Sequence, residues 1–148
     1  MILVIVVQEK NSSSVMEDCN VVVGIIINNK NEVLIALRPL HVVQPGVWEF
    51  PGGKVEPNET LENALIREFF EEIGIAIKRA EFFLKIEKSF PEKNILLILH
   101  AFRIHDYTGV PYGRENQQIQ WVSIDNLTKY TFPEANSDIV FALQAQKS

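Results

Sequence analysis

The chain has 148 residues, of which 47% are hydrophobic and 22% charged, as is typical of one globular domain. Its net charge of −5 argues against sequence-independent binding to duplex nucleic acid, because such binding needs clustered Lys and Arg along one face. The single cysteine, Cys19, excludes an intramolecular disulfide and fits a reducing compartment. No apolar run reaches the length of a membrane span, so we expect a cytoplasmic protein.

The first residues precede the strong strand signals. Met1 to Val7 are apolar, but they lack a basic n-region and end at a polar segment, which is not typical of a secretory signal. The polar residues 8–19 predict a flexible lead-in. We therefore expect an N-terminal extension over residues 1–19 and a single domain over residues 20–148.

The domain is expected to open with strands. Val21 to Ile27 and Val33 to Leu37 are apolar, β-branched runs separated by turn-forming residues, so they predict a hairpin. A loop over residues 40–46 should follow, and then a short strand at Val47 to Phe50. Pro51-Gly52-Gly53 is expected to break that strand sharply.

A helix is predicted next, over Leu61 to Ile73. Thr60 is a good N-cap residue, and Gly74 suits the position after the helix end, where a left-handed backbone is common. Apolar residues recur at helical spacing from Leu61 to Ile73, so one face should pack on the core while the acidic residues lie on the other side.

Later segments again favour strands, followed by a final helix. The expected strands cover Ile75–Ile77, Glu81–Phe90, Asn94–Ile104 and Ile119–Ile124, and the helix covers Ala135–Gln146. Strands that surround one helix and end in another indicate a mixed sheet with helices packed on it.

The helix over 61–73 carries an unusual acidic face. Glu68, Glu71 and Glu72 are three and four residues apart, so their carboxylates project to nearly the same side. At about 4 Å and an effective dielectric of about 20, each like-charged pair costs about 4 kcal/mol before salt screening. A bound cation reverses the sign of that term, and oxygen donors favour Mg²⁺ or Mn²⁺ over Zn²⁺. The simpler interpretation is a solvated face with an ion pair from Arg67 to Glu71.

The spacing of residue types from Gly53 to Ile75 resembles the Nudix box, G-x5-E-x7-R-E-U-x-E-E-x-G-U with U apolar, and every defined position matches. Other motifs, among them Trp48-Glu49-Phe50-Pro51 and Phe132-Pro133-Glu134-Ala135-Asn136, resemble the bacterial MutT type of Nudix hydrolase. The resemblance implies an α/β (α+β) fold, an α/β/α sandwich with a mixed central sheet and helices on both faces. It also implies hydrolysis of 8-oxo-dGTP to 8-oxo-dGMP and pyrophosphate, which prevents mutation.

The resemblance further implies a site. The expected catalytic residues are Glu68, Glu71, Glu72 and Glu115. The same four residues and Gly52 are the expected metal ligands. Glu115 would be either a ligand or the general base, and Glu68 is the other candidate for the base. Four residues of the box are expected to support the site rather than to react, namely Gly53, Glu59, Arg67 and Gly74. The metal would be Mg²⁺, for which Mn²⁺ can substitute, and the partner a small nucleotide, without nucleic acid or membrane. A monomer is expected.

The expected substrate-binding residues are Arg38, Glu49, Phe50, Pro51, Gly52, Lys93 and Asn136. Asn136 matches the purine-reading asparagine of the family. Guanine presents O6 and N7 as two acceptors, whereas the 8-oxo base carries a hydrogen on N7. An amide has one donor end and one acceptor end and complements only the oxidised pattern. Arg38 would contact phosphate or the 8-oxo edge, and Phe50 would pack either on the base or in the core. Asn136 could also serve as a plain N-cap of the last helix.

Two alternatives remain open from the sequence. The first is a Nudix hydrolase of another nucleoside diphosphate derivative, either ADP-ribose or a dinucleoside polyphosphate. ADP-ribose is a candidate because Pro91 lies near the position of a proline in ADP-ribose pyrophosphatases. The second is a nucleotide-binding module without turnover. The intact acidic cluster argues against that module. The chain departs from the family pattern at three positions that bear on the base pocket. It has Lys93 in place of Arg, Glu92 in place of Asp and Leu37 in place of a second Arg.

Overall fold

The computed structural model describes residues 3–4, 15–38 and 46–147. Most of the expected N-terminal lead-in and nearly all of the expected loop over 40–46 lie outside these ranges. Within them no helix is both long and apolar enough to cross a membrane.

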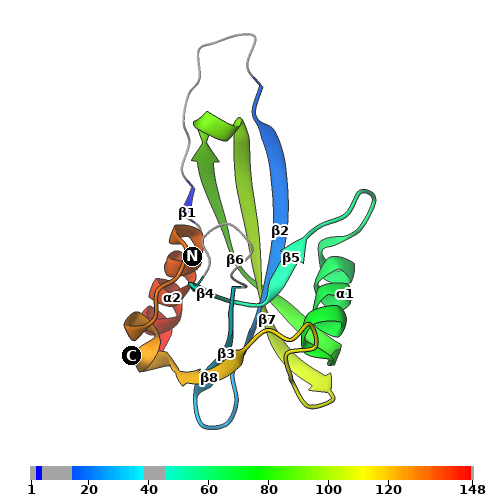
Figure 1. Ribbon diagram of the computed structural model, residues 1–148, viewed down its shortest axis with the longest axis vertical. Coiled ribbons are helices and arrows are strands. Elements are labelled where there is room, and N and C mark those ends of the chain that lie inside the picture. The colour runs from blue at the N-terminus through cyan, green and yellow to red at the C-terminus, as the bar shows by residue number, and fades with distance from the viewer. Residues whose placement is uncertain (1–2, 5–14, 39–45, 148) are drawn as a thin grey trace.

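The larger sheet has five strands in the spatial order β1 (Leu3–Val4), β6 (Ala76–Phe90), β7 (Ile95–Thr108), β2 (Glu17–Ile26) and β5 (Gly52–Lys54). β2 runs parallel to β7, and β1 runs parallel to β6. β6 and β7 are antiparallel, as are β2 and β5. The predicted mixed sheet is therefore confirmed. Figure 1 shows β2, β6 and β7 as the long strands of the molecule.

A second sheet has three strands in the order β4 (Trp48–Glu49), β3 (Glu32–Leu37) and β8 (Ile119–Ser123), and both pairs in it are antiparallel. The predicted hairpin between β2 and β3 is wrong. Only one bridge, from Ile27 to Val33, joins the two strands before they diverge into different sheets. The turn was predicted correctly, but long-range pairing with β7 and β8 outcompetes the local partner.

Three further boundaries differ from the expectation. β2 starts at Glu17, paired with Ile95, so residues 17–19 belong to the sheet and not to a flexible lead-in. The expected break after the strand at 47–50 is present, since β4 ends at Glu49, but Gly52 and Gly53 then form β5 against β2. The two strands predicted over 75–90 are one strand, β6, whose register with β7 shifts around Arg79 and Phe82.

The helices lie on opposite sides of the long strands (Figure 1). α1 (Leu61–Ile73) has the predicted bounds, and α2 (Glu134–Lys147) starts one residue early and ends one residue late. β2 contributes side chains to two hydrophobic cores, one on each of its faces, because successive side chains of a strand point to opposite faces. Val22 and Ile26 pack with α1, whereas Val23 and Ile25 pack with α2, β3 and β8. The expectation of helices on both faces is confirmed.

Short 3₁₀ helices connect the remaining elements. η1 (Pro91–Lys93) joins β6 to β7, and η2 (Ile124–Lys129) follows β8. Lys93 and its neighbours in η1 are exposed. The site described below lies where β5, α1 and the segment before β8 meet.

Candidate active site

The two capping residues set the bounds of α1, and the packing of one face sets its orientation. The Thr60 hydroxyl accepts the Asn63 N–H at 3.0 Å, as predicted for an N-cap. Gly74 has the left-handed φ of 73°, and its N–H donates to Phe69 O, as predicted for the residue that ends the helix. Phe69 and Ile73 are fully buried, so the packing of one face orients the acidic face toward β5 and the segment before β8.

Arg67 joins the helix to the loop before it. Its Nε and Nη2 donate to the two carboxylate oxygens of Glu59 at 2.8 and 3.0 Å, and Nη2 also donates to Lys54 O at 3.0 Å. The Arg67 hydrogen bonds hold the pKa of Glu59 below its ordinary value, and the Glu59 carboxylate in turn raises the pKa of Arg67. A bidentate pair of this kind fixes geometry as well as charge. The supporting role expected for Glu59 and Arg67 fits these contacts.

The remaining Nη1 of Arg67 reaches two acids of the box. It donates to Glu68 Oε2 at 3.1 Å and to Glu71 Oε1 at 3.4 Å. Glu71 is exposed, and the ion pair proposed as the simpler interpretation is thus present. Glu68 differs because its side chain is only 14% exposed and lies against Gly53. A Cβ placed on Gly53 would lie 2.3 Å from the carboxylate carbon of Glu68. Glycine is therefore needed for this carboxylate to lie where it does.

Glu72 lies where several negative charges converge. Burial raises its pKa, and so do a hydrogen bond with Glu68 and the charges of Glu68, Glu49 and Glu115. Burial also raises the pKa of Glu49, whereas the Arg38 guanidinium, 2.8 Å from Glu49 Oε1, acts in the opposite direction. Four acids from β4, α1 and the loop before β8 are thus electrostatically coupled at one place.

The donor set suits a hard cation. In the described part of the chain no cluster of three or more His, Cys, Asp or Glu side chains has the geometry of a formed metal site. The pKa of Glu72 is raised by its burial and by Glu68 beside it, so these two carboxylates lie close together, and a divalent cation can bind between such oxygens. Because Mg²⁺ keeps several waters and substrate phosphate oxygens as ligands, two carboxylates fit its needs.

Glu115 is brought to this place by contacts of its own loop. The Arg114 N–H donates to Glu72 O at 2.8 Å, and the Glu115 N–H donates to Gln117 Oε1 at 2.9 Å. Glu115 is exposed, and its charge acts on Glu72. The sequence placed Glu115 only through the resemblance, because the residues between it and the box carry no local signal for this approach.

A cavity of about 460 Å³ lies beside the acids, within the range usual for small-molecule sites. It brings together five of the seven expected substrate-binding residues, namely Arg38, Glu49, Phe50, Gly52 and Asn136. Phe50 is buried in the core and also lines the cavity, so it occupies both of the positions considered for it. Its ring is stacked on Phe132 with 5.5 Å between the centroids. Asn136 is 8% exposed and is the third residue of α2, so it is not the N-cap.

The other two expected residues do not line the cavity. Pro51 is buried, and its carbonyl accepts the Gly24 N–H at 2.9 Å. Lys93 extends its ammonium to 6.0 Å from the ring centroid of Phe90, which does line the cavity. β6 ends with Phe90 at the wall of the cavity, and Lys93 lies in η1, which follows and does not line the cavity.

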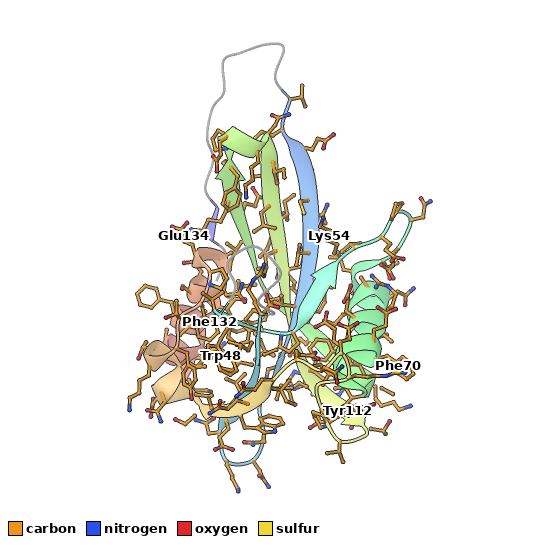
Figure 2. The ribbon with its side chains drawn as sticks, viewed as in Figure 1. Trp48, Lys54, Phe70, Tyr112, Phe132 and Glu134 are labelled. Atoms are coloured by element: carbon orange, nitrogen blue, oxygen red, sulfur yellow. The ribbon has the colours of Figure 1, made fainter. Side chains whose placement is uncertain are left out.

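Several lining residues belong to motifs that carry the resemblance but were not among the expected substrate-binding residues. They include Lys54, Phe90 and Glu134. Lys54 is two residues from Gly52, so both lie on the same side of β5, and period-two alternation could have indicated it. Glu134 stands two residues before Asn136 in the motif quoted above. Figure 2 labels Glu134 on α2 and Lys54 on β5, two elements that both contribute to the wall of the cavity.

The model of one protein family, described as the NUDIX domain, matches residues 19–143. The chain therefore belongs to the Nudix family. Hydrolases of this family use a divalent metal ion and act on small nucleotides. The expected family and fold class are confirmed.

Individual relatives cover nearly the same part of the chain. An 8-oxo-dGTP diphosphatase of Escherichia coli K12 is 36% identical over 129 residues, which are 87% of this chain and 98% of the relative. A CTP pyrophosphohydrolase of the same organism is 33% identical over 86% of this chain and 93% of the relative. A solved structure from a study of MutT of Aliivibrio salmonicida and Vibrio cholerae has a TM-score of 0.76 and 40% identity, and it covers 88% of this chain and 99% of that one.

Proposed function

We propose that this protein hydrolyses oxidised purine nucleoside triphosphates, 8-oxo-dGTP in particular, to the monophosphate and pyrophosphate, with Mg²⁺ as its metal and Mn²⁺ as a substitute. The observation that carries the proposal is the cavity that extends from the Asn136 amide to Gly52 and Gly53. Gly53 directly contacts the Glu68 carboxylate. A base held at Asn136 would thus have its phosphates directed toward the acids of α1.

The proposed metal ligands are the carboxylates of Glu68, Glu71, Glu72 and Glu115, with the Gly52 carbonyl. When bound, such a metal lowers the pKa of a water and neutralises charge that develops on phosphoryl oxygens. Arg67 holds Glu68 by a hydrogen bond, so this carboxylate is oriented before substrate arrives. Glu71 would have to leave its long contact with the same guanidinium to reach the metal.

A general base must take a proton from the attacking water, and two acids can do so. Glu68 is largely buried and tied to Arg67, whereas Glu115 is exposed. Loss of a general base typically costs about 10²–10⁴-fold in rate. Comparing the pH–rate profiles of Glu68→Gln and Glu115→Gln identifies the base, because only its loss removes the acid limb of the profile.

The orientation of the Asn136 amide supports a preference for the oxidised base. Asn136 Oδ1 accepts the backbone N–H of Phe50 at 3.1 Å, which fixes the amide oxygen as the end near Phe50. The oxygen keeps a second lone pair, which can accept N7–H of an 8-oxo purine while the amide N–H donates to O6.

Ordinary guanine would meet this amide with the wrong polarity. Its N7 lone pair would face the lone pair of Asn136 Oδ1. Rotating the amide by 180° would turn its N–H groups toward N7, but it would break the hydrogen bond from the Phe50 N–H and place an amide N–H against that N–H. A site built to pair with a substrate N–H can reject an analogue without it strongly, because buried polar groups are left unpaired.

A panel of substrates tests the proposal. It should contain 8-oxo-dGTP, dGTP, CTP, ADP-ribose and a dinucleoside polyphosphate with Mg²⁺, with separate detection of pyrophosphate and phosphate. We expect the highest kcat/KM for 8-oxo-dGTP, with release of pyrophosphate. CTP is included because one relative is a CTP pyrophosphohydrolase. A higher kcat/KM for CTP or ADP-ribose would replace the proposed substrate, and no turnover of any of them would favour the binding module.

A further inference from the structure

The segment between β7 and β8 covers the C-terminal end of α1. α1 has no basic residue in its last turn, where carbonyls lack partners within the helix. The segment supplies donors instead. The Tyr112 N–H donates to Ile73 O at 3.1 Å, and Arg114 Nη1 donates to Phe70 O at 2.8 Å. Figure 2 shows Phe70 and Tyr112 beside this end of α1. The loop that carries Glu115 is therefore anchored to the helix that carries the box.

One side chain in this segment joins the backbones of two site acids. Gln117 Nε2 donates to the carbonyl of Glu72 at 3.0 Å. Its Oε1 accepts the N–H of Glu115 at 2.9 Å. Both ends of a single planar amide are thus used, one on the helix and one on the loop, and Gln117 is half-buried. Because the amide is rigid, it sets the distance between these two backbone positions.

Several bonds hold this loop, and the one made by the Glu115 N–H itself goes to Gln117. Glu115 is exposed, and its own loop passes through a left-handed Asn116 with φ of 65°. Ligand orientation by a neighbouring hydrogen bond commonly contributes about 10–100-fold to metal affinity or activity. We propose that Gln117 is a positioning residue, which places Glu115 against Glu72 through its amide. This inference rests on the function proposed above.

Gln117→Met tests the bridge, because it keeps the length of the side chain but removes both the N–H donor and the carbonyl acceptor. We expect kcat to fall about 10–100-fold while KM for the nucleotide stays within about threefold, since Gln117 does not line the cavity. Gln118→Met is the matched control at the next position, which is exposed, and it should retain the wild-type kcat. A wild-type kcat in Gln117→Met would overturn the inference.

A double-mutant cycle separates positioning from general destabilisation. If Gln117 acts through Glu115, Gln117→Met should cause little further loss in a Glu115→Gln background. An equal loss in both backgrounds would overturn the assignment. Should Gln117→Met fail to fold, Gln117→Glu replaces it, because it keeps the acceptor for Glu115 and removes the donor to Glu72, with a negative charge added.

A second readout does not depend on turnover. The rise in melting temperature caused by Mg²⁺ reports binding to the native state. We expect a smaller rise in Gln117→Met than in Gln118→Met, and equal rises would count against the inference. An inactive wild type would refute the proposed function while this comparison still decided the role of Gln117. An active wild type with an unaffected Gln117→Met would refute the inference alone.

Discussion

Gly53→Ala is the most direct probe of the geometry around Glu68. The new Cβ would lie 2.3 Å from the carboxylate carbon and Oε2 of Glu68 and 2.5 Å from Oε1, whereas ordinary contacts lie at 3.4–4 Å. The carboxylate must therefore move by about 1 Å. A misplacement of about 1 Å can cost about 10²-fold in rate. We accordingly expect kcat to fall about 10²-fold, or about 2.7 kcal/mol in activation free energy.

The same substitution should affect stability little. The clashing atoms belong to the end of a side chain that can rotate. Replacing Gly by Ala also lowers the entropy of the unfolded chain, which typically stabilises a protein by about 0.4–1 kcal/mol. We expect the melting temperature to stay within about 4 °C of wild type.

Gly52→Ala is the contrasting variant one residue away. Its Cβ would lie 1.9 Å from the backbone oxygen of Val22 in β2, which cannot rotate away. We expect Gly52→Ala to lower the melting temperature by more than about 5 °C, because β5 must separate from β2. Steady-state kinetics and thermal melts of both variants check the pair. A Gly53→Ala enzyme with kcat within threefold of wild type would refute the close contact with Glu68 or its part in the reaction.

Glu72→Gln should abolish nearly all Mg²⁺-dependent hydrolysis and leave the protein folded, and retained hydrolysis in the nucleotide assay would contradict the metal assignment. The stability of the metal-free protein should fall as pH rises above about 4.5, by up to about 1.4 kcal/mol per pH unit, because the raised pKa of Glu72 lets the native state keep a proton that the unfolded chain releases. Urea unfolding between about pH 5 and pH 8 measures this slope, and Glu72→Gln should flatten it; an equal slope in both proteins would assign the proton elsewhere. Asn136→Ala should lower the ratio of kcat/KM for 8-oxo-dGTP over that for dGTP by about 10-fold or more, and an unchanged ratio would count against the pairing with the amide. Millimolar Mg²⁺ should raise the melting temperature of the wild type, and the absence of a shift would mean that the metal enters only with nucleotide.

Several parts of the fold could be read from the sequence because their causes are local. The bounds of α1 follow from a capping Thr60, a helical period of apolar residues and Gly74 at the end, and the structure has the same bounds. The turn after β2 was likewise predicted, since its Asn-rich residues favour it regardless of context.

The errors arose where distant partners compete with near ones. β2 and β3 are connected by a turn but separate, because β2 pairs with β7 along ten residue pairs and β3 pairs with β8. The local sequence at Gly52 and Gly53 favours a break, yet these residues form strand β5 by pairing with β2. Pairing energies of this kind depend on residues far away in the chain, which local propensity does not contain.

The sequence by itself determined the chemistry of this protein, since the spacing of Glu68, Glu71 and Glu72 on a helix puts carboxylates on one face whatever surrounds it. Only the tertiary structure decided how those carboxylates are used. It ties Arg67 to the Lys54 carbonyl, couples Glu72 to Glu49 and Glu115, and closes a cavity against Asn136. The physical reason is that helical spacing is a property of a few consecutive residues, whereas burial and the approach of separate segments arise only when the whole chain packs.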